Sequence, residues 1–140
     1  MIFEDLEAWK MARLLVGEIY RLTREQTISR DFGLCSQVQR AAVSVMSNIA
    51  EGFERLHAAE KLQAYNVARG SAAEVRSLLY VIEDNYPESA TAVSSIRGTI
   101  ESTGRLVSGL INSARSRRIK NTATLLCFLV AIPVGAYFLL

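Results

Sequence analysis

The chain has 140 residues, of which 50% are hydrophobic and 21% charged, and it contains only two prolines. This composition excludes a disordered chain and predicts one packed domain, with long helices favoured by the scarcity of proline. The formal net charge of +2 arises from one short basic cluster, because the remaining residues carry 12 basic and 14 acidic groups. The acidic body weakens any prediction of nucleic-acid binding. The cluster consists of Arg115, Arg117, Arg118 and Lys120.

Four stretches have the three- and four-residue hydrophobic spacing of amphipathic helices. They cover residues 4–24, 34–53, 58–84 and 88–117, and the aperiodic segment 25–33 is predicted as a loop. The near-heptad spacing of the third stretch favours antiparallel packing in a bundle. The residues expected to face the core are, in chain order, Leu6, Trp9, Ala12, Val16 and Ile19; Val38, Ala41, Ala42, Val45, Ile49 and Phe53; Leu62, Tyr65, Ala68, Ala72, Val75, Leu79 and Ile82; and Val93, Ile96, Ile100, Thr103, Val107 and Leu110.

The fourth stretch has weak helix propensity, because it contains three glycines and many serines and threonines. Each glycine weakens a helix by about 1 kcal/mol relative to alanine, so tertiary contacts must hold this helix. We also expect these glycines, Gly98, Gly104 and Gly109, to permit close approach of another helix.

Residues 123–140 carry no charge and read ATLLCFLVAIPVGAYFLL. As a helix they would extend ~27 Å, close to the ~30 Å hydrocarbon core of a bilayer. Together with the preceding basic cluster, this predicts a single-pass protein of the cell inner membrane whose bundle faces the cytoplasm. The alternative is a buried terminal helix. We therefore divide the chain into a bundle (1–117), a basic juxtamembrane linker (118–122) and a transmembrane segment (123–140).

The N-terminus and the cysteines indicate neither secretion nor a metal site. The first seven residues include three acids and no apolar core, which is unlike a secretory signal. Cys35 and Cys127 are far apart and form no CxxC pair, so both are predicted as reduced thiols. His57, the only histidine, has no partner at ligand spacing and is expected at a helix start. No cofactor is predicted.

Three segments resemble a bacterial family of four-helix bundles. They are FEDLEAWKMAR (3–13), GLCSQVQRAAVSVMSNIAEGF (33–53) and ARGSAAEVRSLL (68–79), of which SNIAEG (47–52) and ARGS (68–71) are the most specific. The family is known from proteins encoded in intervening sequences of 23S rRNA genes, and its relatives include accessory proteins of diversity-generating retroelements. The resemblance implies an antiparallel four-helix protomer, a homopentamer, no established catalysis and, for strongly basic members, nucleic-acid binding.

The chain departs from the family pattern in four respects. Met46 stands where many relatives have proline, and His57 stands where a serine usually begins the third helix. The body is acidic, and the hydrophobic tail is an addition. We expect the tail to relocate the bundle to a membrane.

Five polar residues within the matching segments are the candidates for chemistry. The two arginines and two carboxylates among them could in principle take part in acid–base catalysis. We favour a structural role for them, as a polar network that fixes the helix register or a subunit contact. Surface ion pairs are the third interpretation. No serine here has a base at a recognisable spacing. The residues are Arg40, Asn48, Glu51, Arg69 and Glu74.

The basic cluster has three interpretations: a topogenic flank, a contact with anionic lipid, or a contact with nucleic acid. From these observations we predict a non-catalytic, homo-oligomeric scaffold or interaction protein, anchored by its C-terminus. The first alternative is an RNA- or nucleoprotein-binding accessory module. The second is an oligomeric membrane effector, in which clustered tails perturb the bilayer.

Overall fold

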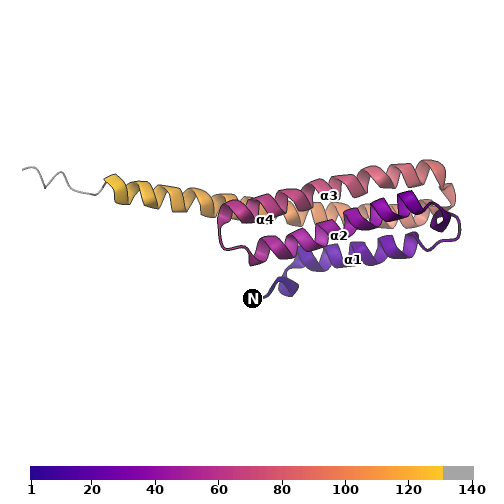
Figure 1. The fold of residues 1–140 in the computed structure, drawn as a ribbon, viewed down its shortest axis with the longest axis horizontal. Coiled ribbons are helices and arrows are strands. Elements are labelled where there is room, and N and C mark those ends of the chain that lie inside the picture. The colour runs from indigo at the N-terminus through magenta and orange to yellow at the C-terminus, as the bar shows by residue number, and fades with distance from the viewer. Residues whose placement is uncertain (131–140) are drawn as a thin grey trace, which may run out of the picture.

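A computed structural model shows an all-helical, antiparallel bundle, which confirms the predicted four-helix bundle but not the transmembrane helix predicted to follow it (Figure 1). It describes residues 1–130, and the side chains of residues 1–120, 122 and 123. Each helix packs against the next, and α1 also packs against α4. The helices are α1 (Glu7–Leu22), α2 (Phe32–Glu54), α3 (Ala58–Asn85) and α4 (Ala90–Val130), with short 3-10 turns at Phe3–Asp5, Ile28–Arg30 and Pro87–Ser89.

Local sequence signals set the helix ends. The Asp31 carboxylate accepts a hydrogen bond from the Leu34 backbone N–H at 3.1 Å, which caps the start of α2. The Tyr86 hydroxyl donates to the same carboxylate at 3.1 Å and ties the end of α3 to that cap. His57 lies at the N-cap position of α3, as expected, although its side chain makes no capping bond. Pro87 follows the end of α3 and opens the next turn.

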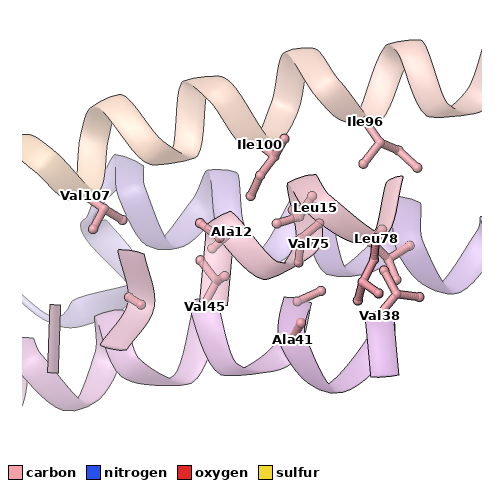
Figure 2. Close-up of a cluster of buried hydrophobic side chains, with 14 of the residues drawn as sticks. Ala12, Leu15, Val38, Ala41, Val45, Val75, Leu78, Ile96, Ile100 and Val107 are labelled. Atoms are coloured by element: carbon pink, nitrogen blue, oxygen red, sulfur yellow. The ribbon is translucent and has the colours of Figure 1, made fainter. Parts of the chain in front are cut away.

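The core is a continuous apolar cluster to which all four helices contribute. Figure 2 shows Leu15, Val45, Val75 and Ile100 pointing into this interior from α1, α2, α3 and α4. The predicted core residues of α3 are all buried. In α1 the buried face is shifted, because this helix must fill the space between α2 and α4. Leu6, Trp9 and Val16 lie at the edge of the core, and the buried positions are Ala8, Ala12, Leu15, Ile19 and Leu22.

The closest approach of a glycine to another helix occurs at Gly52 of α2. A Cβ atom at this position would lie 2.4 Å from the Tyr65 ring of α3. Only glycine therefore lets the buried Tyr65 ring lie against α2. We expected the glycines of α4 to permit close approach of another helix. No other helix approaches them closely, since a Cβ at Gly98, Gly104 or Gly109 would meet nothing within 4 Å.

The structure of the C-terminal part of α4 contradicts the predicted transmembrane segment. Residues 118–122, predicted as a linker, lie inside α4, which projects beyond the other helices (Figure 1). Among residues 1–130, no helix is sufficiently long and apolar to cross a bilayer. The apolar stretch that the structure describes in α4, residues 123–130, is much shorter than the ~20 residues required. The predicted single-pass location in the inner membrane is therefore wrong. The rest of the predicted segment, residues 131–140, lies outside the described residues.

Candidate functional site

The five predicted polar residues lie on α2 and α3 but do not meet in one network within the single chain. Asn48 is partly buried, and the other four side chains are exposed. Glu51 pairs with Arg55 one turn further along α2, which is an exposed contact. In the described part of the chain, Arg40 and Arg69 have neither a hydrogen bond nor an ion pair. A role for these residues in a subunit contact stays a prediction.

Small polar side chains fix the register of α2 against α3. The Ser44 and Ser71 hydroxyls are 2.7 Å apart across the two helices. Asn48 Nδ2 donates to the Ser44 carbonyl at 2.8 Å and to its hydroxyl at 3.2 Å. Ser71 belongs to the ARGS segment and Asn48 to SNIAEG, so the two matching motifs meet at this contact. The pairing of Ser44 with Ser71 was missed because sequence spacing does not show which serines face each other.

Glu74 makes a second polar contact between the same helices. Its Oε1 atom accepts a hydrogen bond from Gln37 Nε2 at 3.4 Å, and both groups are exposed. Exposed contacts of this kind contribute little to stability.

Lys61 caps the C-terminal end of α2. Its ammonium group donates to the Phe53 carbonyl at 2.6 Å and to the Gly52 carbonyl at 3.2 Å. It also lies 5.7 Å from the centre of the Phe53 ring. Partial burial lowers the pKa of Lys61, and the nearby positive charge of Arg117 lowers it further.

A shallow hollow of about 410 Å³ lies where α1 meets the outer side of α2. We call its α2 portion the α2 face and define it by Ser36, Arg40, Val43 and Ser47. Tyr20 of α1 forms the opposite wall. Val43 is 37% exposed although it is a large apolar residue. The α2 face is thus mostly small and polar, with one apolar side chain and one arginine that has no partner among the described residues.

A larger depression runs between the outer sides of α3 and α4, and we call it the α3–α4 groove. One hollow of about 580 Å³ is followed along the same helices by another of about 610 Å³. The first is lined by Arg69, Ala72, Ala73, Arg76, Ile100, Glu101, Gly104, Arg105 and Ser108. The second is lined by Ala59, Leu62, Gln63, Asn66, Val67, Arg115 and Arg118. All four members of the basic cluster are exposed, and Arg115 and Arg118 thus belong to the groove.

Nucleophilic and metal-binding groups do not converge in the described part of the chain. No group of three His, Cys, Asp or Glu side chains among these residues has the geometry of a metal site. The Cys35 thiol is buried and donates to the Ile28 carbonyl at 3.3 Å. Burial, and secondarily the charge of Asp31, raises the pKa of Cys35, which disfavours the reactive thiolate. The side chain of Cys127 lies outside the described residues.

Comparison with protein-family models identifies the family. The model described as 23S rRNA-intervening sequence protein matches residues 4–109, which is most of the chain. The chain belongs to this family. No curated protein matches it.

The family match covers the features that organise the bundle. The Ser44–Ser71 contact, the Gly52–Tyr65 contact and the α2 face all lie within residues 4–109. The first hollow of the α3–α4 groove also lies there, whereas Arg115 and Arg118 of the second hollow lie outside. The resemblance of SNIAEG and ARGS to this family is therefore confirmed.

Proposed function

We propose that this chain is a non-catalytic interaction protein that assembles with copies of itself through the α2 face. The observation that supports this proposal is the composition of that face. Val43 is 37% exposed, and Arg40 has no hydrogen bond or ion pair among the described residues. Both lie in the segment GLCSQVQRAAVSVMSNIAEGF, within the residues that match the family.

The neighbouring residues favour a helix as the partner of this face. Ser36 and Ser47 are small and exposed, so the backbone of a second helix can approach α2 there. Packing against a copy would bury Val43 and offer Arg40 a carboxylate such as Glu51, which in the single chain pairs only with Arg55. Complete burial of an exposed aliphatic side chain contributes about 1.5–3 kcal/mol. Val43 is 37% exposed, so burying the remainder would contribute roughly 0.5–1 kcal/mol per protomer. The pentameric state is part of the proposal through the family resemblance alone.

A non-catalytic role is supported by the separation of the candidate groups. Arg40 lines the hollow beside α1, whereas Arg69 lines the groove beside α4. Asn48 and Glu74 are engaged in contacts between α2 and α3. Acid–base catalysis needs its groups within reach of one substrate, and these groups face different sides of the bundle.

Light scattering on the full chain tests the assembly. We expect a mass that is a multiple of the 15.5 kDa chain, and five times this value for a pentamer. Val43→Glu should weaken self-association at least ~10-fold, because it buries an unpaired carboxylate in the contact. Val81→Glu is the matched control, since Val81 is a valine of α3 with a similar exposure of 43%. A mass of 15.5 kDa for the unmodified chain at micromolar concentration would refute the proposal.

A further inference from the structure

Beyond Ala114, α4 leaves the bundle and continues as a projecting helix. Ile111 and Ala114 are the last buried residues of α4 that the structure describes, and every described side chain from Arg115 to Ala123 is exposed. The helix extends to Val130, about 24 Å further, past the ends of the other helices (Figure 1). Helices in proteins obtain most of their stability from packing, and the described side chains of this projecting part lack it.

A hollow of about 530 Å³ lies where α4 leaves the N-terminal part of α3, and we call it the exit hollow. It continues the second hollow of the α3–α4 groove, with which it shares three lining residues. Its floor is apolar, and Ile119 in it is 69% exposed. Val67, in the adjoining second hollow, is 46% exposed. Contiguous apolar surface with a charged rim is typical of interaction sites. The described residues that line the exit hollow are Leu62, Arg115, Arg118, Ile119, Thr122 and Ala123.

Two arginines form the rim of the exit hollow. Arg115 and Arg118 are three residues apart on α4, so their side chains share one face of the helix. Neither guanidinium makes a hydrogen bond or an ion pair among the described residues. No carboxylate is among the described residues that line this hollow or the adjoining one. A partner that covers the apolar floor must therefore bring its own acidic groups to the rim, because unpaired charges are costly to bury.

The surface runs along two helices, which suits a third helix as its occupant. The lining of the two adjoining hollows covers residues 115–123 of α4 and 59–67 of α3, each about 12 Å long. An amphipathic helix that lies between α3 and α4 would place apolar side chains at three- and four-residue spacing against Leu62 and Ile119. Acidic side chains one turn apart on its flank would then reach the two arginines of the rim.

We infer that the exit hollow and the adjoining second hollow bind an amphipathic helix of another protein, which carries acidic residues beside its apolar face. The apolar floor favours a helix over a nucleic-acid strand, whose phosphates cannot cover Ile119 and whose bases find no aromatic side chain for stacking among the described lining residues. It also favours another protein over a second copy through the same segment, because the basic clusters of two copies would repel each other. The α4 side of this surface lies outside residues 4–109, so it is not part of the family match and goes beyond the proposed self-assembly.

The test uses the full chain and a fluorescein-labelled synthetic peptide of about 18 residues, long enough to form a helix on binding, followed by fluorescence anisotropy. This glutamate peptide has leucine at helical spacing on one face and glutamate on both flanks of that face. A second peptide has lysine in place of every glutamate. A third has the composition of the first in an order that gives no apolar face.

The substitution Ile119→Ser tests the apolar part of the contact. We expect it to weaken binding of the glutamate peptide about fivefold or more at every salt concentration, because the peptide no longer buries this side chain. Leu14→Ser is the matched control, since Leu14 of α1 is 48% exposed and lines neither hollow. The control should bind within about twofold of the unmodified chain. Equal affinities of the two variants would overturn the inference.

The double variant Arg115→Gln and Arg118→Gln tests the charged rim. We expect it to bind the glutamate peptide about fivefold or more weakly at low salt, and the loss should shrink at high salt, where exposed charges are screened. Its control combines Arg24→Gln and Arg30→Gln, which removes the same charge from exposed residues that line neither hollow. Equal losses in the two double variants would overturn the inference, because they would show that only net charge matters. Circular dichroism with thermal unfolding verifies that all the variants fold.

The control peptides and two competitors identify the class of partner. The lysine peptide and the reordered peptide should each bind at least about tenfold more weakly than the glutamate peptide. Comparable affinity for either of them, or no binding of the glutamate peptide at low salt, would overturn the inference. Displacement of the glutamate peptide by oligouridylate at equal charge concentration would assign the surface to nucleic acid, and displacement by phosphatidylglycerol vesicles would assign it to anionic lipid. A lower assembled mass of Ile119→Ser in light scattering would assign it to a second copy. Each of these three results would also overturn the inference.

Discussion

At the scale of single residues, one glycine has a structural task that no other residue can perform. Gly52 ends the SNIAEG motif, and the Tyr65 ring occupies the space where its Cβ would be. Tyr65 is buried, and burial raises the pKa of its hydroxyl. The ring cannot move outward without losing its place in the core, so a side chain at position 52 must separate α2 from α3.

The first prediction concerns this contact. Gly52→Ala should lower the free energy of unfolding by about 1–3 kcal/mol, because overpacking outweighs the gain in helix propensity. Urea denaturation monitored by circular dichroism measures the change. Gly98→Ala is the matched control, since Gly98 is an exposed helical glycine with free space around it. That substitution should stabilise the chain by up to about 1 kcal/mol. If Gly52→Ala instead stabilises the chain, the Tyr65 ring can shift at little cost, which would contradict this prediction.

At the scale of the elements, Asp31 joins two helix termini that are far apart in sequence. Its carboxylate caps α2 through the Leu34 N–H and accepts the Tyr86 hydroxyl at the end of α3. A neighbouring contact has the same purpose, since the Ser89 hydroxyl donates to Glu25 at 2.6 Å. The loops at this end of the bundle are therefore held by side chains and not by apolar burial alone.

The second prediction is that Asp31→Ala destabilises the chain by about 1–2 kcal/mol, as expected for loss of an N-cap. Asp31→Asn is the conservative control, because asparagine also caps helices well and should retain most of the stability. Unfolding midpoints in denaturant provide the measurement. Equal losses for both substitutions would indicate that the negative charge, and not the cap, is the stabilising feature.

The third prediction concerns alkaline pH. The hydrogen bond to Asp31 is the main cause that raises the pKa of Tyr86 above its usual value near 10, with smaller contributions from burial and from the charge of Asp31. The bond therefore stabilises the fold fully below about pH 10 and is lost as the pH rises through the folded-state pKa. Unfolding midpoints of the unmodified chain and of Tyr86→Phe should differ at pH 7 and converge at alkaline pH. A constant difference would contradict this linkage.

At the scale of the whole molecule, two surfaces on different helix pairs are available for different partners. The α2 face lies beside α1, and the α3–α4 groove lies on the pair α3 and α4. In the arrangement of Figure 1, α4 also continues beyond the bundle, so the groove leads onto a projecting helix. A substitution on one surface therefore leaves the other surface intact.

The fourth prediction assigns assembly to one of these surfaces. Val43→Glu, on the α2 face, should reduce the assembled mass. The double variant Arg69→Gln and Arg76→Gln, in the α3–α4 groove, should retain the mass of the unmodified chain. Light scattering at equal concentration measures both masses. An equal loss of mass in the two variants would contradict assembly through the α2 face.

The sequence by itself determined where the secondary structure elements of this protein lie. Hydrophobic residues at three- and four-residue spacing located all four helices to within a few residues at most boundaries, and the buried positions of α3 were those predicted. The end predicted for the third stretch, residue 84, lies next to the observed end of α3 at Asn85, and SNIAEG with ARGS identified the family. These features depend on local propensity and on periodicity, both of which are properties of a single stretch of chain.

Only the tertiary structure decided which surfaces these elements form. Charge counted along the sequence indicated an acidic body, yet the arginines of α3 and α4 line one groove because antiparallel packing brings Arg69 and Arg76 beside Arg105. The pairing of Ser44 with Ser71 and the fit of Tyr65 over Gly52 likewise depend on the relative register of two helices. The apolar end of the sequence resembled a membrane span, but the helix that contains its first part, α4, is not apolar over a sufficient length to cross a bilayer within residues 1–130. Contacts between helices are non-local, so a one-dimensional pattern fixes the face of each helix but not what lies opposite that face.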